Sequence, residues 1–357
     1  MKKVLCLLLF VLMVMPMCLP LSSCASDQNT LVVCNWGEYI CNEDDPEDER
    51  IFDVIARFEK QTGINVNYVT AATNEDLYGT MKAGGVSYDV IFPSDYMAQR
   101  MISEGMVQKI NFENVPNIAN ISDDFKNMYY DPTNEYTVPY FWGTVGIIVN
   151  TDECQETVDS WDDMWTDKYP NRVLMFNNPR DAFAIALNKL GYSLNTTNEA
   201  EIRAAAEELK KTKFNYVMDE FFDLIPSESA VMAAYYAGDY LYVAQENPDL
   251  NLEFVRPESG VNLFNDVMCI PSNAKHKENA EKFINYMLTG EVGLANTLYV
   301  GYSTPNTQVL AMLPEEIRND PVAYPEIDPK WERFQALPEA TNQLMRDLWY
   351  EVLKANK

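Results

Sequence analysis

The chain has 357 residues, of which 54 are acidic and 27 are basic, so its formal net charge is −27. Such a chain repels nucleic acid and anionic lipid headgroups and attracts cations, which excludes a nucleic-acid-binding protein. The length suggests two domains rather than one.

The first 23 residues have the pattern of a secretion signal. Two lysines open the chain, and residues 4–17 are almost wholly apolar, a run too short for a membrane span. Two serines then precede Cys24, an order that resembles the lipobox of bacterial lipoproteins. The resemblance implies cleavage before Cys24, a lipid on its thiol, a tether over 24–28, and a location on the outer face of the cell membrane or in the periplasm. The alternative is an ordinary signal peptide with a chance cysteine.

Strand and helix patterns alternate along the rest of the chain. Apolar runs predict strands, and amphipathic spacing predicts helices, of which the first and the third along the chain end at Gly63 and Gly105. The strands are expected at 31–34, 64–69, 89–92, 143–149, 173–176 and 267–270, and the helices at 52–62, 75–83, 96–104, 182–190, 200–211, 277–288 and 339–353. This alternation indicates an α/β protein with a parallel, doubly wound sheet.

The cysteines and the single histidine offer little chemistry. Four cysteines lie beyond the proposed anchor, at widely separated positions, and we expect small buried thiols there. The pattern leaves open whether Cys34 and Cys41 form a disulfide. His276 lies in a polar turn between two lysines and is expected to be exposed. We therefore expect no metal site and no cofactor.

The usual signatures of an enzyme are missing from the sequence. It has no glycine-rich dinucleotide fingerprint, no phosphate-binding Walker sequence and no Gly-x-Ser-x-Gly elbow. His276 is not placed to act as the base for a serine or cysteine nucleophile. These absences favour a binding protein without catalysis.

Aromatic and acidic residues stand together at the ends of three expected strands. These groups are Asn35-Trp36-Gly37-Glu38-Tyr39, Pro93-Ser94-Asp95-Tyr96 and Phe264-Asn265-Asp266. Ligands of open α/β sheets bind beyond the carboxyl ends of strands. Carboxylates suit the ammonium ends of an organic amine, and flat rings suit its methylene stem and its charge. Each aromatic residue taken alone is as well explained by core packing.

Seven segments, in order and over nearly the whole mature chain, resemble the spermidine/putrescine-binding proteins of bacterial ABC transporters. They are NWGEY (35–39), YDVIFPSDY (88–96), VPYFWG (138–143), SWDDMW (160–165), LNKLGYSLN (187–195), DVMCIPSNAK (266–275) and GYSTPN (301–306). The motifs are specific to the family and less so to the ligand within it.

The resemblance implies a two-lobed clamshell of the type II periplasmic-binding-protein class, with the ligand in the cleft between the lobes. One lobe would hold 29–140 and 265–308, and the other 141–264 and 309–357. It also implies a protein, usually a monomer, that captures putrescine or spermidine and delivers it to a membrane permease.

Carried over residue by residue, the family motif implies a set of ligand-binding positions. These are Trp36, Glu38, Tyr39, Ser94, Tyr96, Asn178, Asp181, Tyr236, Phe264, Asp266 and, in a loosely aligned region, Gln335. Four of these positions depart from the pattern, since the family has acids where Asn178 and Asp181 stand and usually tryptophans where Tyr236 and Phe264 stand. An amide in place of a carboxylate removes a charged partner for an amine.

The preference between the two polyamines stays open. Glu38 and Asp266 would hold the ends of a diamine, and Asp181 is the expected partner of a third nitrogen. The alternatives are a binding protein for another cationic solute, a polyamine sensor with a different membrane partner, and a secreted hydrolytic enzyme that uses Glu38 and Asp266 as a carboxylate pair.

Overall fold

The computed structural model describes residues 29–356. The proposed signal and the whole tether, including Cys24, lie outside the described residues, so the expectations for them stay predictions. Over 29–356, every helix is too short or too polar to cross a lipid bilayer.

In the described residues the strands form one ten-stranded sheet in the order β2-β1-β3-β10-β5-β8-β6-β7, with β4 beside β10 and β9 beside β5. The strands are β1 (Thr30–Asn35), β2 (Asn65–Thr70), β3 (Val90–Ile91), β4 (Val107–Gln108), β5 (Thr137–Asn150), β6 (Val173–Phe176), β7 (Asn215–Val217), β8 (Met232–Tyr236), β9 (Leu252–Val255) and β10 (Leu263–Pro271).

The expectation of a wholly parallel sheet is wrong. Strands β1, β2 and β3 pair in parallel, as do β6, β7 and β8. The long strands β5 and β10 are antiparallel to each other and to their other neighbours in the sheet. Strand–helix–strand alternation predicts the parallel units, but the two central strands pair over long sequence distances that local patterns do not report.

Strand β5 is longer than the sequence pattern suggested. It starts at Thr137 instead of residue 143, and all 14 of its residues are buried. Pro139 lies inside it, although proline usually excludes a central strand because it has no N–H to donate. It pairs with Val267 where the register of β5 and β10 shifts, so the missing donor falls at an irregularity that tolerates it.

Over the described residues, the seven expected helices are present and agree with their expected bounds within a few residues, and five further helices were not expected. The helices are α1 (Val54–Thr62), α2 (Asn74–Ala83), α3 (Asp95–Ser103), α4 (Pro179–Lys189), α5 (Glu199–Leu209), α6 (Phe221–Leu224), α7 (Ala237–Glu246), α8 (Lys277–Met287), α9 (Gly290–Val300), α10 (Thr307–Met312), α11 (Glu315–Arg318) and α12 (Glu339–Ala355). Helix α1 shows why: the carboxylate of Asp53 accepts the amide of Ala56, and Gly63 ends the helix at a φ of 69°.

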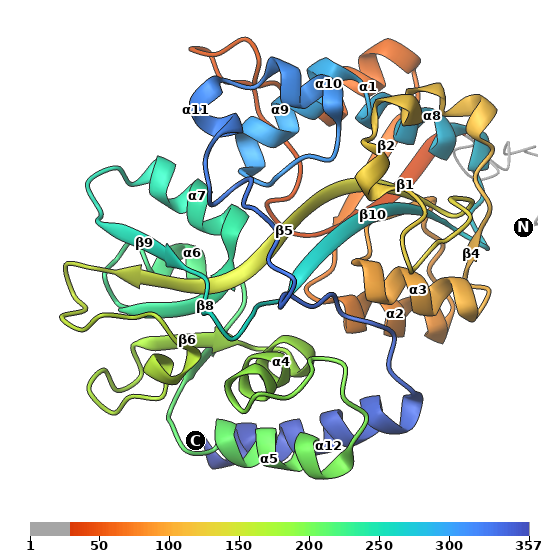
Figure 1. The fold of residues 1–357 in the computed structure, drawn as a ribbon. Helices are drawn as coiled ribbons and strands as arrows, with labels where there is room; N and C mark the ends of the chain where they lie inside the picture. Colours follow the sequence, from red (N-terminus) through yellow and green to blue (C-terminus); the bar gives the residue numbers. More distant parts are fainter. Residues whose placement is uncertain (1–28, 357) are drawn as a thin grey trace, which may run out of the picture.

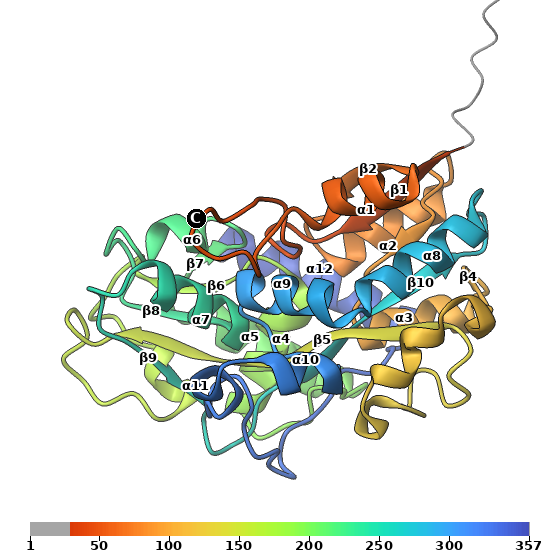
Figure 2. The same cartoon turned by 90° about the horizontal axis from the view of Figure 1, so that it is seen from above.

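Strands β5 and β10 run between two groups of elements (Figure 1). Strands β1 to β3 lie with α1, α2, α3, α8 and α9 on one side, and β6 to β9 lie with α4 to α7 and α12 on the other. Figure 2 shows the same division from above. Each group has its own core: Phe58 and Phe283 are buried in the first, and Phe183 and Trp349 in the second.

The remaining cysteines and the histidine lie in the packed interior or at its edge. Cys34, Cys41, Cys154 and Cys269 are free and buried. His276 is half-buried rather than exposed, because its Nδ1 lies 3.1 Å from a buried carboxylate oxygen of Asp89. Within the part of the chain that the structure describes, no cluster of three or more histidine, cysteine or acidic side chains is arranged to hold a metal ion.

Candidate functional site

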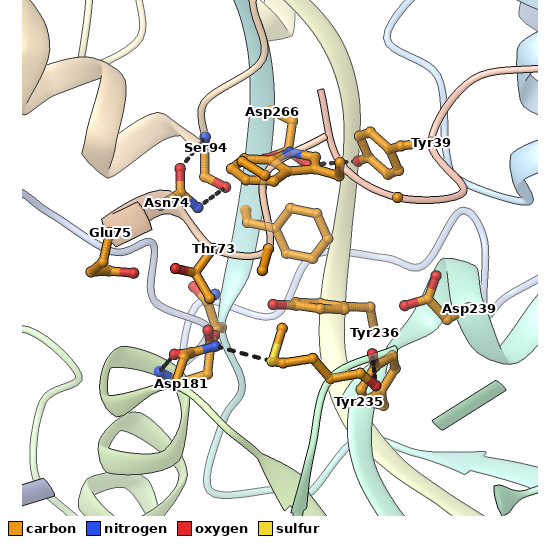
Figure 3. Close-up of a pocket in the computed structure, with 18 of the residues that line it drawn as sticks. Tyr39, Thr73, Asn74, Glu75, Ser94, Asp181, Tyr235, Tyr236, Asp239 and Asp266 are labelled. Carbon is orange, nitrogen blue, oxygen red and sulfur yellow. Dashed lines mark hydrogen bonds between the residues drawn. The ribbon is translucent and has the colours of Figure 1, made fainter. Parts of the chain in front are cut away.

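A cavity lies between the two groups of elements and is lined by residues of both. It contains about 890 Å³ of space, part of it open to solvent. The structure brings nine of the eleven expected residues into its wall: Trp36, Tyr39, Ser94, Tyr96, Asn178, Asp181, Tyr236, Phe264 and Asp266. Figure 3 shows the acids distributed around the ring of Tyr236, with Asp266, Asp181, Glu75 and Asp239 on different sides of it.

The structure places the other two expected residues, Glu38 and Gln335, outside this wall. Glu38 is exposed and has a φ of 49°, a tight turn that sends Gly37 and Tyr39 into the cavity and Glu38 away from it. Gln335 is also exposed and borders a smaller neighbouring cavity, while Phe334 faces the main one.

Asp266 is the most deeply buried of the expected acids, with 5% of its surface exposed. It precedes the register shift of β10 and forms an isolated bridge with Ser94. The hydroxyl of Tyr39 donates a hydrogen bond of 2.5 Å to its Oδ2, and Figure 3 shows the two side chains facing each other. Its Oδ1 is buried and has no hydrogen-bond partner among the described residues. A buried oxygen in a cavity wall favours a ligand that donates a hydrogen bond.

Burial raises the pKa of Asp266 to about 6, and the hydrogen bonds from Ser94 and Tyr39 limit that rise. The carboxyl therefore keeps a proton to a higher pH than an exposed aspartate does, and a cation beside Oδ1 would favour its ionised form.

A second acidic place is formed at the start of α4. Asn178 caps the helix, and its side-chain oxygen accepts the amide of Asp181 at 2.9 Å. Asp181 stands in the first turn, where the helix dipole favours a negative charge. Burial nonetheless raises the pKa of Asp181 to about 6, and the hydrogen bond with Asn178 opposes the rise. Asn178 thus serves as a helix cap.

Glu75 stands beside Asp181 in the cavity wall and was not expected from the sequence. It lies in the first turn of α2, after the capping residue Thr73. Its carboxylate accepts a hydrogen bond of 3.0 Å from the hydroxyl of Tyr96. Burial raises the pKa of Glu75, and the bond with Tyr96 opposes that effect. An acid in the first turn after a strand end was the sequence signal that could have found it.

Asp239 and Asp219 form a third acidic place that sequence reasoning also missed. Burial raises the pKa of Asp239 to about 8; a hydrogen bond from Tyr302 opposes this, and the charge of Asp219 adds to it. Asp219 is exposed, and its Oδ2 is 3.7 Å from the position of a Cβ at Gly37. It therefore faces the turn at Gly37 across the cavity. Asp239 follows the end of β8, the same relation that pointed to the residues after β3.

Aromatic rings fill the wall between the acids. The ring centroids of Tyr236 and Phe264 are 5.4 Å apart in an edge-to-face arrangement, and those of Phe264 and Tyr302 are 6.2 Å apart. Tyr302 reaches the wall because residue 238 is glycine: a Cβ on Gly238 would lie 2.0 Å from the Tyr302 ring. These faces offer both apolar contact and the negative side of an aromatic quadrupole.

The residue types in the cavity wall indicate the class of ligand. Six carboxylic acids line the cavity: Glu75, Asp95, Asp181, Asp219, Asp239 and Asp266. Among the residues from 29 to 356 that line it, none is lysine, arginine or histidine. A wall that carries acids and aromatic faces but no basic side chain of its own suits an organic cation.

Comparison with known proteins agrees with this chemistry. A family model described as bacterial extracellular solute-binding protein matches residues 53–325. The spermidine/putrescine-binding periplasmic protein of Salmonella typhimurium is 36% identical over 318 residues, which cover 85% of each chain. The protein of the same description from Escherichia coli is 34% identical and covers 93% of this chain and 94% of its own.

Solved structures show the same relationship. A putative spermidine/putrescine ABC transporter protein from Listeria monocytogenes superimposes with a TM-score of 0.83 at 36% identity, over 91% of this chain and 99% of that one. The mixed sheet and the interlobe position of the cavity agree with the two-lobed, type II clamshell expected from the sequence. The chain therefore belongs to the bacterial extracellular solute-binding proteins, in the group named for spermidine and putrescine binding.

Proposed function

We propose that the protein captures putrescine or spermidine in this cavity and delivers it to the permease of an ABC transporter. The observation that supports this most strongly is the acidic, aromatic cavity wall, which includes no basic side chain among the described residues that line it. The names of the relatives in Salmonella typhimurium and Escherichia coli support the same ligands.

Within the cavity, we assign the ammonium groups to three acidic places. Asp266 offers the unpartnered Oδ1, Asp181 and Glu75 form the second place, and Asp239 with Asp219 forms the third. A diamine engages two of these places and a triamine engages all three. Methylene segments between the nitrogens lie against the aromatic faces.

The proposal includes a hinged pair of lobes. One lobe comprises 29–140 and 265–308, and the other 141–264 and 309–357, so that β5 and β10 cross from one to the other. The separate cores on the two sides support this division. Closure around the ligand would bury it between the lobes and present the closed form to the permease.

The remaining expectations belong to the same proposal. The protein acts as a monomer, without catalysis, and is held at the outer face of the cell membrane or in the periplasm by a lipid on Cys24. The relatives are binding proteins of transporters, which supports a role without turnover. The pair needed by the hydrolytic alternative is Glu38 and Asp266, and Glu38 lies outside the cavity wall.

Calorimetric titration of the purified protein with putrescine, spermidine, cadaverine and arginine tests the proposal. We expect dissociation constants of about 10 μM or tighter for putrescine or spermidine, and weaker binding of arginine because its carboxylate would meet the acids of the wall. The absence of binding to both polyamines would contradict the proposed ligand.

A further inference from the structure

Arg180 is buried in a position that is unusual for its charge. It occupies the first turn of α4, where the helix dipole disfavours a cation, and only 4% of its surface is exposed. It forms no salt bridge with an acid of the described residues. Its guanidinium instead donates to the carbonyl of Leu194 at 2.8 Å and to the side chain of Asn195 at 2.9 Å. Its Nε is buried without a hydrogen-bond partner in the described part of the chain.

The guanidinium stacks on the outer side of the cavity wall. Its central carbon is 4.1 Å from the ring centroid of Phe334 and 5.7 Å from that of Tyr96. These two rings contact each other edge to face at 5.5 Å, and both line the cavity while Arg180 does not. Arg180 therefore supports two aromatic residues of the wall from behind, through cation–π contact.

The same charge acts on the acids at this end of the cavity. Burial raises the pKa of Glu75 and of Asp181, and in both cases the positive charge of Arg180 opposes the rise. The groups that face Arg180 are Tyr96 from α3, Glu75 from α2, Asp181 from α4 and Tyr129 from the segment before β5.

Among the described residues, no arginine or lysine has an equivalent position at the opposite end of the cavity. Asp239 is influenced by Tyr302 and by Asp219, and no basic residue contributes to its pKa. The two ends therefore differ in kind, although both are acidic: one has a fixed cation behind its wall and the other has none.

We propose that Arg180 is a positioning residue of the binding cavity, which holds Phe334 and Tyr96 in place and keeps Glu75 and Asp181 ionised in the empty protein. This inference deepens the proposed function and rests on it for the ligand. The consequence is an asymmetric site. At one end, Glu75 and Asp181 are already ionised when an ammonium group binds. At the other end, Asp239 must release a proton before it can pair with an ammonium group.

The first test needs no ligand. Carboxyl-carbon NMR of the purified protein measures the titration of individual acids, with Glu75→Gln, Asp181→Asn and Asp239→Asn to assign the signals. We expect Arg180→Met to raise the pKa of Glu75 and Asp181 by about one and to leave that of Asp239 unchanged. Changes smaller than ~0.3 in both acids of a folded variant would overturn the inference.

Calorimetry with a polyamine in buffers of different ionisation enthalpy gives the second test. We expect Arg180→Met to bind ~10-fold more weakly or worse and to release more protons per ligand than the wild type. The control is Arg203→Met on the exposed face of α5, where Arg203 pairs only with Glu199; it should leave both quantities unchanged.

Arg180→Lys separates charge from shape. Lysine keeps the cation but lacks the planar guanidinium, so we expect unchanged proton release and weaker binding. This variant also serves if Arg180→Met does not fold. Equal proton release and equal affinity in Arg180→Lys and the wild type would contradict the support of the aromatic wall. A wild-type protein that binds no polyamine would refute the proposed function, and the ligand-free NMR titration would still decide the role of Arg180.

Discussion

The hydroxyl of Tyr39 donates a 2.5 Å hydrogen bond to Oδ2 of Asp266, a residue 227 positions later in the chain. Tyr39 is fixed in turn, because its own carbonyl accepts the hydroxyl of Tyr140 at 2.9 Å. One oxygen of Asp266 is thus occupied and oriented by the protein, and Oδ1 is left for a ligand. The carboxylate is held in position before a ligand arrives, which lowers the entropic cost of binding.

Replacement of Asp266 by asparagine tests this role. We expect Asp266→Asn to weaken polyamine binding more than ~10-fold, because a desolvated ammonium group would lose its anion. Calorimetry measures the effect, and Asp249→Asn, on an exposed loop, is the matched control. Affinity within twofold of the wild type would show that Asp266 does not hold the amine.

The family motif and the observed geometry assign ligand binding to different glutamates, Glu38 and Glu75. The motif names Glu38, but the cavity wall contains Glu75. We expect Glu75→Gln to weaken binding ~10-fold or more, since it removes a half-buried charge, and Glu38→Gln to change it less than ~2-fold, since exposed charges interact weakly through water. The opposite ranking in the same titration would show that the bound form rearranges the turn after β1.

The raised pKa values predict that binding weakens as the pH falls. Polyamine ammonium groups stay protonated well above neutrality, so the acids carry the dependence. Below pH 8 the proton on Asp239 must be displaced, and below pH 6 those on Asp266 and Asp181 must be displaced as well. Each displaced proton costs up to a factor of ten in the dissociation constant per pH unit.

Calorimetry at pH 5.5, 7.0 and 8.5 measures this curve. We expect Asp239→Asn to flatten it between pH 6 and 8 and to leave the steeper part below pH 6 unchanged. A wild-type affinity that is constant from pH 5.5 to 8.5 would mean that the acids of the cavity are ionised without a ligand.

The lipid anchor gives a prediction outside the described residues. We expect Cys24→Ala to move the protein from the membrane fraction to the soluble fraction of expressing cells, because one residue carries the only proposed attachment. Metabolic labelling with a fatty acid should mark the wild type alone. Persistence of Cys24→Ala in the membrane fraction would contradict the anchor.

Local patterns predicted most of the helices and strands, because capping and periodicity act over a few residues. Gly63 was expected to close the first helix and does so in the left-handed conformation. The antiparallel course of β5 and β10 was not predictable in this way, since partners such as Phe264 and Gly143 are far apart in sequence. A strand that continues through Pro139 was not predictable locally either, because a bulge that accommodates proline depends on the neighbouring strand.

The site was predictable where acids and aromatics stand at the ends of the expected strands, as at Tyr39, Tyr96 and Asp266. It was not predictable at Glu38, because the turn after β1 directs alternate side chains to opposite sides. Tyr302 was missed for another reason: its place in the wall depends on the lack of a side chain at Gly238, which is remote in sequence.

The paired course of β5 and β10 has a mechanical consequence. Because both strands run from one group of elements to the other, we expect the proposed lobes to open by bending and twisting this two-stranded ribbon, with the hydrogen bonds between the two strands intact. The amides of Phe141 and Asn265, near the middle of that ribbon, should then exchange slowly with deuterium in both the empty and the loaded protein. The ribbon would then act as an elastic hinge, which returns the cleft to the same open geometry after each ligand is released to the permease.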